Sequence, residues 1–578
     1  MRGLPSPTNV RLLTLYIMPV RMIKQLVSEL TKVRERLENR ETFGAVLIVA
    51  MGLLARLWAT TGTYLDPDEA LCYMQANQTS LPLAYKASLN VVHPPLLIFG
   101  LYYIRHLGTS ELILRLPSVI AGTAFCWVAY KWVARLLGRT AGWIGLIFFA
   151  FLPPLIEFSA EVRQYALLLL FAACTLYFLE RALVEGSVGM MLLSLTFLYL
   201  AMLSHYSAIL FAAAVGGYAL VRIASQRPLV RLTVSWVIGQ MGVLGLSLVF
   251  YVTHISRLAG NGREQSFLAW MRTSYIPNFY FKPGQDNVLL FLVSRMHTVF
   301  QYVFGQSLVG SLAFLLFVAS LVLLCRKSFK PDSVPIDGRL TALFLVLPFA
   351  ITGGAALARS YPFGGTRQCM FLAIFAISGV SLVLSKAVGQ RIVYGVAVAV
   401  VLVLICNVFG RPRQPYMRRA NRHSDQMERA MEFVREHIPR AEPIFTDYQS
   451  GILVGHYLCH QGPVPRWSVA PGFELRECDN HRITSPVEIW MFTLDAFLRN
   501  WDPFVRAYKL RAGDRVCVVE QGVNLATQLR EHFPEFHQLQ PSSFGRNIEV
   551  FELTVCRSPI SATSPGRPPF RPPNLCVE

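Results

Sequence analysis

Ionisable side chains stand in a few short polar segments between the long apolar runs of this 578-residue chain. Charged groups at lipid depth are costly, so they are usually kept where they serve a function. A carboxylate can take a proton from a hydroxyl group as a general base. An arginine can hold a phosphate through two hydrogen bonds and stabilise it as it leaves. Together these groups suit transfer from a lipid phosphate. The candidates are Asp66, Asp68, Glu69, His93, Arg115, Glu161, Arg163, Tyr165, His205, Tyr206, Arg359, Tyr361, Arg367 and Gln368.

Several of these side chains also have a purely structural explanation. Asp66 stands before a proline and is favoured as the N-cap of a helix rather than as a catalytic group. Glu161 and Arg163 could form a local ion pair, and Arg115 could lie at the membrane interface with its charged group in water. The two histidines could simply mark helix boundaries. The residue types alone therefore leave both explanations open.

The composition excludes an ordinary soluble protein and argues against a nucleic-acid-binding one. Only 15% of the residues are charged and 53% are hydrophobic, whereas roughly a quarter of a soluble globular chain is charged. The net charge of +19 could suggest nucleic acid, but most Lys and Arg residues flank apolar runs, and no basic stripe with interleaved aromatic residues occurs. We therefore expect an integral membrane protein that binds membrane lipids and no nucleic acid.

Eleven apolar runs have about the 20 residues that a helix needs to cross a bilayer. Basic residues mark the cytoplasmic ends of spanning helices. Here they recur in every second connection between spans, provided that the stretches 93–107 and 287–304 lie at the membrane surface instead of spanning it. This predicts a cytoplasmic N-terminus, an extracytoplasmic C-terminus and candidate residues gathered at the outer face. The expected spans are 43–61, 115–135, 141–159, 164–183, 187–204, 206–224, 232–252, 307–325, 339–357, 367–386 and 391–409.

Three further segments flank the spanning region 43–409. Residues 1–42 are predicted to be a cytoplasmic amphipathic segment rather than a cleaved signal peptide, because their apolar run is short and contains a proline. Residues 410–556 are expected to form a small extracytoplasmic α/β domain. Residues 557–578 are rich in Pro and Ser and are expected to be disordered.

Hydrophobic periodicity gives the elements of the 410–556 domain. Spacing of i, i+3, i+4, i+7 from Met427 predicts an amphipathic helix, and a second helix is expected over 524–532. The cysteines of this domain could form disulfides, although one sequence does not fix the pairing. The expected strands are 444–448, 488–492, 515–520 and 549–555, and the cysteines are Cys459, Cys478, Cys517 and Cys556.

The order of the polar motifs resembles the family 39 glycosyltransferase-like membrane proteins. The motifs are Asp-Glu in the first outer loop, His-Pro-Pro-Leu, Arg-Leu-Pro-Ser, Glu-Val-Arg-Gln-Tyr at a helix start, and Gly-Gly-Thr-Arg-Gln before a late span. This family is related to the dolichyl-phosphate-mannose protein mannosyltransferases and the lipid A aminoarabinose transferases. The resemblance covers roughly 43–409, extends weakly beyond it, and implies an all-α polytopic membrane protein of GT-C fold with surface helices in the first outer loop.

The resemblance also implies a reaction: transfer of a sugar from a polyprenyl-phosphate donor to an acceptor hydroxyl, with inversion. Asp68 matches the catalytic Asp of the first loop, with Glu69 beside it, and Glu161 matches the second outer acidic position. Arg115 matches the arginine that opens the second span, and Arg367 matches the late arginine that faces the donor phosphate. No cofactor is required by this resemblance, although a divalent metal between the acids is possible.

Two departures from the family pattern limit what the resemblance implies. His93 stands where the aminoarabinose transferases have a lysine before Pro-Pro, so a phosphate contact there is less certain. The segment after residue 410 does not resemble the β-trefoil domain of the protein mannosyltransferases, which puts a protein acceptor in doubt. The acceptor is therefore left as a glycan, a lipid or a protein.

The resulting hypothesis is a hexosyl- or pentosyltransferase in a bacterial inner membrane. Asp68, perturbed by Glu161, acts as base, while Arg163 and Arg367 hold the donor phosphate and His93, Arg115, Tyr165 and His205 complete the substrate-binding set. The main alternative is a lipid-linked sugar transporter or flippase, which predicts charges near the bilayer midplane and repeated halves. A third is an assembly protein whose outer domain binds a partner.

Overall fold

The computed structural model describes twelve parts of the chain. Residues 1–39 lie outside them, so the predicted amphipathic segment 1–42 is left undescribed apart from its last three residues. The parts described are 40–89, 93–226, 229–256, 269, 271–326, 337–389, 391–410, 422–459, 466–470, 472–478, 480–556 and 575–576.

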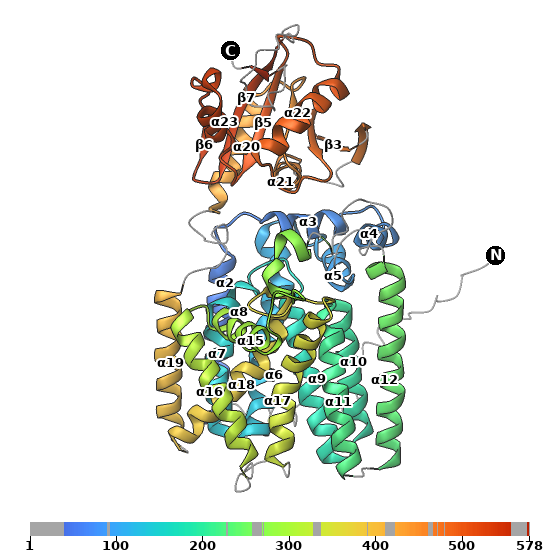
Figure 1. The fold of residues 1–578 in the computed structure, drawn as a ribbon, viewed down its shortest axis with the longest axis vertical. Coiled ribbons are helices and arrows are strands. Elements are labelled where there is room, and N and C mark those ends of the chain that lie inside the picture. The colour runs from blue at the N-terminus through green and yellow to red at the C-terminus, as the bar shows by residue number, and fades with distance from the viewer. Residues whose placement is uncertain are drawn as a thin grey trace, which may run out of the picture.

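A bundle of long helices forms the larger part of the molecule (Figure 1). Within the described residues, nine helices are long and apolar enough to cross a membrane, as the low charge content predicts. The chain is a multi-pass membrane protein. The nine are α2 (Arg40–Thr60), α6 (Glu111–Leu137), α9 (Tyr165–Glu185), α11 (Ser207–Gln226), α12 (Val230–Phe250), α16 (Ser307–Cys325), α17 (Gly338–Leu357), α18 (Ala373–Ala387, preceded by the 3₁₀ turn η4, Arg367–Leu372) and α19 (Ile392–Phe409).

Two of the eleven expected spans are not among these nine long helices. The run 187–204 forms α10 (Val188–Ser204, 17 residues). The run 141–159 is interrupted: α7 (Arg139–Phe151) has 13 residues, and α8 (Pro153–Glu157) follows. The break falls before a proline, where the α conformation is disfavoured. Arg56 of α2 donates hydrogen bonds to the carbonyl groups of Phe149 and Ala150 near the broken end, as the free carbonyls of a helix end require.

Short helices form a layer between the bundle and the C-terminal domain (Figure 1). They are α3 (Pro67–Ala76), α4 (Leu81–Ser88) and α5 (Leu96–Ile104). The stretch 93–107, expected as a surface helix, contains α5, and the stretch 287–304 forms α15 (Val288–Phe304). Both helices are too short to be counted among the nine long spans.

The C-terminal domain is a mixed sheet with helices, as the sequence predicts. The strands run in the order β2-β3-β4-β1-β5-β7-β6, with β8 paired to β7; β1 is parallel to β4 and β5, and the other pairs are antiparallel. The elements are α20 (Ser424–His437), β1 (Pro443–Phe445), α21 (Tyr448–Leu458), β2 (Arg466–Ala470), β3 (Phe473–Cys478), β4 (His481–Pro486), α22 (Leu494–Tyr508), β5 (Arg515–Gln521), α23 (Leu525–His532), β6 (Ser542–Phe544), β7 (Ile548–Val555) and β8 (Leu575–Cys576).

The strand predicted at 488–492 is wrong. Instead, this segment joins the start of α21: Ile489 and Trp490 carbonyl groups accept hydrogen bonds from the first amides of that helix, and Phe492 N–H donates to Asp447. Strands β2, β3 and β4 were not predicted. In β3 the sequence Phe-Glu-Leu-Arg-Glu-Cys carries three charged residues in six, which hides its strand character.

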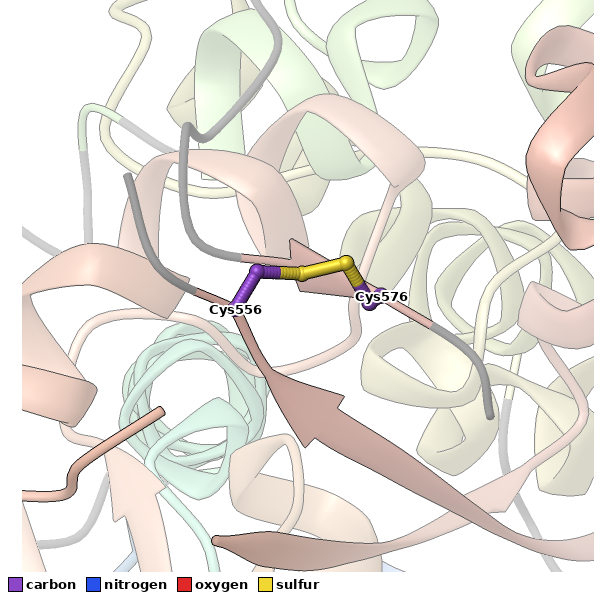
Figure 2. Close-up of a disulfide and its surroundings, with 2 residues drawn as sticks. All are labelled: Cys556 and Cys576. Carbon is purple, nitrogen blue, oxygen red and sulfur yellow. A yellow bond between two sulfur atoms is a disulfide. The ribbon is translucent and has the colours of Figure 1, made fainter. Parts of the chain in front are cut away.

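One disulfide corrects the expectation that the whole segment 557–578 is disordered (Figure 2). Cys556 pairs with Cys576, so the end of the segment predicted to be disordered forms strand β8 instead. Residues 557–574 and 577–578 lie outside the described chain. Cys459, one of the cysteines for which a disulfide was left open, is also disulfide-bonded, whereas Cys517 is a free thiol buried in β5.

Candidate active site

Helix α3 begins with a capping box that fixes the first outer loop. Asp66 is the N-cap: its carboxylate accepts a hydrogen bond from the N–H of Glu69 at 2.9 Å, and the Glu69 carboxylate accepts one from the N–H of Asp66 at 2.9 Å. Pro67 occupies the first helical position, where its missing N–H costs nothing. The structural explanation favoured for Asp66 is therefore confirmed. Asp68 lies in the same turn, and its side chain makes a different set of contacts.

A fully buried group of charges, here called the inner cluster, consists of Asp66, Glu69, Arg115 and Arg422. Arg115 donates to both oxygens of Glu69 at 2.8 Å and also to the loop carbonyls of Thr60, Thr63 and Tyr64. Arg422, from the segment before α20, lies 3.2 Å from Asp66 and 3.3 Å from Glu69. No side chain of this cluster is more than 7% exposed.

The electrostatics of the inner cluster keep Glu69 ionised. Burial alone would raise the pKa of Glu69, but Arg115 and Arg422 outweigh it and lower that pKa to about 2. The pKa of Asp66 is raised by burial and by the neighbouring Glu69, with Arg422 acting against both. Because Arg115 is buried and donates to the loop, the geometry suits holding α3 in place better than contacting a substrate.

A second group, here called the outer cluster, consists of Asp68, Arg163 and Arg367. Arg367 Nη1 lies 2.8 Å from Asp68 Oδ2, and Arg163 Nη2 lies 3.3 Å from the same oxygen. The side chain of Asp68 is 25% exposed and that of Arg367 14%, so solvent reaches this cluster. Burial would raise the pKa of Asp68, but the two guanidinium groups hold it well below its usual range.

The outer cluster borders a wall of rings. The His93 and His205 rings stack with centroids 5.7 Å apart, and Tyr165 packs on His205 at 5.3 Å. The Arg163 guanidinium lies 5.7 Å from the centre of the Tyr165 ring. Burial, together with Arg163 and Arg367, lowers the pKa of His205 to about 3, and burial, Arg163 and His205 bring that of His93 well below its usual value. Both histidines are therefore neutral at physiological pH.

The turn that carries Glu161 links the two clusters. The N–H of Val162 donates to Glu69 Oε1 at 2.8 Å, and Ser118 Oγ donates to the carbonyl of Arg163 at 3.0 Å. Glu161 is buried, and burial together with the carboxylates of Asp66 and Glu69 raises its pKa well above the usual value. The surroundings of Glu161 therefore favour the protonated form of its carboxyl group.

The residues predicted as catalytic or substrate-binding thus lie in the inner cluster, in the outer cluster, or in the rings and turn beside them. The other candidates lie apart from both clusters: Arg359 is exposed, the Tyr361 hydroxyl donates to the carbonyl of Gln368, and Tyr206 packs on Phe250 and His254. Arg422 is the member that sequence reasoning missed. It is one of five arginines between positions 411 and 422, and such a run after the last span gives no signal that one of them is buried. Among the residues that the structure describes, no group of three or more His, Cys, Asp or Glu side chains could hold a metal ion.

Comparison with known families gives one match, to a segment of the chain. Residues 92–254 match the family model described as dolichyl-phosphate-mannose-protein mannosyltransferase. The matched segment is less than half of the chain, and it supports the resemblance to GT-C membrane glycosyltransferases. The resemblance seen in the order of the motifs is thereby confirmed. The matched segment contains the His-Pro-Pro-Leu, Arg-Leu-Pro-Ser and Glu-Val-Arg-Gln-Tyr motifs.

Several solved structures are similar to most of the chain. ArnT from Cupriavidus metallidurans in the apo state is 13% identical, with a TM-score of 0.49, over 89% of this chain and 98% of that one. The same protein bound to undecaprenyl phosphate is 14% identical, with a TM-score of 0.49, over 88% and 98%. The Archaeoglobus fulgidus oligosaccharyltransferase is 12% identical, with a TM-score of 0.46, over 84% and 70%. Comparison with curated protein sequences gives no significant match.

Proposed function

We propose that the chain is an inverting glycosyltransferase that moves a sugar from a polyprenyl-phosphate donor to an acceptor hydroxyl outside the cytoplasm. The observation that carries this proposal is the outer cluster, in which a partly exposed carboxylate is held by two arginines next to the spanning helices. The matched family is described by a lipid-phosphate sugar donor, which supports the choice of donor class.

In this proposal, binding of the donor phosphate also activates Asp68 as a base. A lipid phosphate and the Asp68 carboxylate are both anions, and both suit the same N–H groups of Arg163 and Arg367. A phosphate that binds these groups therefore displaces Asp68. Once freed from two positive neighbours, Asp68 has a higher pKa and becomes a stronger base.

The chemical step is a single displacement. Asp68 takes the proton of the acceptor hydroxyl, the hydroxyl oxygen attacks the anomeric carbon, and the bond from that carbon to the phosphate oxygen breaks. The electron pair leaves with the polyprenyl phosphate, whose negative charge Arg163 and Arg367 stabilise. Attack on the face opposite the leaving group inverts the anomeric carbon.

The neutral rings supply a wall for the uncharged part of the donor. His93 and His205 have lowered pKa values and so add no positive charge. His93 Nδ1 is buried and has no hydrogen-bond partner among the described residues, so it can bond a sugar hydroxyl or a phosphate oxygen. The proposal assigns no cofactor, because the arginines supply the positive charge; transfer measured with and without a chelator tests this.

The proposed orientation places the N-terminus in the cytoplasm and the C-terminal domain on the outer side of a bacterial inner membrane. Basic turns at alternate ends of the helices support it. The Cys556–Cys576 disulfide supports it independently, since disulfides persist in oxidising compartments such as the periplasm.

The test is transfer of a labelled sugar from polyprenyl phosphate by purified protein in vesicles. Wild type is expected to transfer, and Asp68→Asn to be slower by roughly 100- to 10,000-fold, the range of a lost general base. Asp495→Asn, at an exposed carboxylate of α22, is the matched control and should equal wild type. Full activity of Asp68→Asn would overturn the assigned base. Wild type that moves lipid-linked sugar between leaflets without transferring it would favour a flippase.

A further inference from the structure

We infer that Arg422 is a positioning residue for Asp68, so that the C-terminal domain completes the active site instead of only covering it. The inference rests on the proposed function, because it takes Asp68 as the base. It concerns the one member of the inner cluster that comes from outside the spanning region 43–409.

The segment before α20 is bonded to the loop before α3 through the backbone. The N–H of Tyr64 donates to the carbonyl of Arg422 at 3.0 Å, and the N–H of Ser424 donates to the carbonyl of Gly62 at 3.1 Å. Thr63 and His423 form an antiparallel bridge between these bonds. A stretch of the C-terminal domain therefore pairs with the three residues that lead into Asp66.

The side chain of Arg422 then reaches the two carboxylates of the capping box. It is 5% exposed as a residue and lies within 3.3 Å of both Asp66 and Glu69. Arg115 already bonds both oxygens of Glu69, but among the described residues Arg422 is the only cation in an ion pair with Asp66. Removing Arg422 would leave a buried carboxylate without a positive partner, which is strongly destabilising locally.

The rest of the domain holds the same loop. Tyr457 of α21 accepts a hydrogen bond from the N–H of Leu65 at 2.7 Å and donates one to Glu111 at 2.9 Å. Gln521, at the end of β5, donates to the hydroxyl of Tyr64 at 3.0 Å. Apolar residues of α3, α20 and α21 share one core. These contacts come from three elements of the domain, and apart from the bond to Glu111 at the start of α6 they meet the residues on either side of the N-cap.

The link to Asp68 is the first turn of α3. Asp66 and Glu69 fix that turn through the capping box, and Asp68 lies between them. A change in the position of the N-cap changes the direction of Asp68 relative to Arg163 and Arg367. Misplacement of a catalytic group by about 1 Å can reduce a rate about 100-fold. Arg422 therefore acts on the rate through the placement of Asp68, without contacting the donor.

The experiment compares Arg422→Gln with Arg422→Lys and with Arg429→Gln, a matched control at an exposed arginine of α20 that pairs with Asp425. Two readouts are taken on the full-length protein in vesicles: the kinetics of sugar transfer, and hydrogen exchange of the amides of residues 67–76. Arg422→Gln is expected to lower kcat about 100-fold with KM for the donor changed less than about threefold, and to speed exchange in α3. Arg422→Lys recovers part of both, and Arg429→Gln changes neither.

Wild-type kcat and wild-type exchange in Arg422→Gln would overturn the inference. If Arg422→Gln does not fold, the double variant Asp66→Asn with Arg422→Gln takes its place, because it leaves no unpaired charge and keeps an N-cap side chain; wild-type kcat and exchange in that variant would overturn the inference equally. If the wild-type protein transfers no sugar, the proposed function is wrong. Hydrogen exchange of the α3 amides still decides in that case whether Arg422 holds the loop.

Discussion

The inner and outer clusters are built from the same kinds of side chain, carboxylates and arginines. They differ in whether their ion pairs can exchange a partner. In the inner cluster, Arg115 and Arg422 are at most 7% exposed and are held by carboxylates and loop carbonyls. In the outer cluster, solvent reaches both Asp68 and Arg367. Ion pairs of the first kind cannot exchange a partner without leaving a charge buried. The second kind can release Asp68 to an incoming phosphate, so we assign structure to one cluster and chemistry to the other.

The largest expected effect separates the clusters by stability. Arg115→Gln leaves Glu69 buried beside fewer positive charges and is expected to lower the free energy of unfolding by about 3–5 kcal/mol. Arg367→Gln, at a partly exposed pair, should lower it by less than about 1 kcal/mol while abolishing most sugar transfer. Denaturant unfolding in detergent, measured beside transfer activity, checks this. Equal losses of stability in the two variants would mean that the clusters do not differ in kind.

A smaller effect tests whether Asp68 competes with the donor. Asp68→Asn removes the anion that occupies Arg163 and Arg367, so polyprenyl phosphate without a sugar should bind about tenfold more tightly, or about 1.4 kcal/mol. Titration of the lipid phosphate into vesicles holding each variant measures the Kd, with Asp495→Asn as the control. Weaker binding to Asp68→Asn would show that the carboxylate does not stand in the place of the phosphate.

The smallest effect concerns Glu161, between the clusters. Since its pKa is raised well above the usual value by burial and by the carboxylates of Asp66 and Glu69, the protonated carboxyl is favoured, and ionisation increases as pH rises. Glu161→Gln imitates the protonated form, so the rate of sugar transfer at pH 7 should stay within about threefold of the wild-type rate. This is a smaller loss than removal of a general acid or base causes. At higher pH wild type adds a charge beside Asp66 and Glu69 and should lose activity that Glu161→Gln keeps. A large loss at pH 7 would instead support the catalytic role first predicted for Glu161.

The sequence predicted features that depend on neighbouring residues better than features that depend on residues far apart in the chain. The N-cap role of Asp66 was predictable because its motif is local, from the aspartate before Pro67 to Glu69. Apolar runs gave the long helices because lipid demands about 20 apolar residues, but the break at Pro153 shortened one of them. The motifs marked which segments converge.

The sequence could not provide contacts made across the chain. Arg422 joins Asp66 over more than 350 positions, and no local pattern encodes that meeting. The division of four arginines between two clusters also appears only when their ion-pair partners are known. Strands β2 to β4 were missed because charged residues in them, such as the buried Arg476, are paired within the sheet domain.

The Cys556–Cys576 bond has a consequence for how the protein matures. It joins β8 to the end of β7, and α20, which starts two residues after Arg422, packs against β7. In the proposed orientation these two cysteines, which follow the described spanning helices in the sequence, meet an oxidant only after Cys576 has been exported. A newly made chain therefore acquires its full C-terminal sheet late, after its spanning helices are already in the bilayer. Under the proposed function, Asp68 would thus be incompletely positioned as a base until the C-terminal sheet has formed outside the cytoplasm, where the acceptor is.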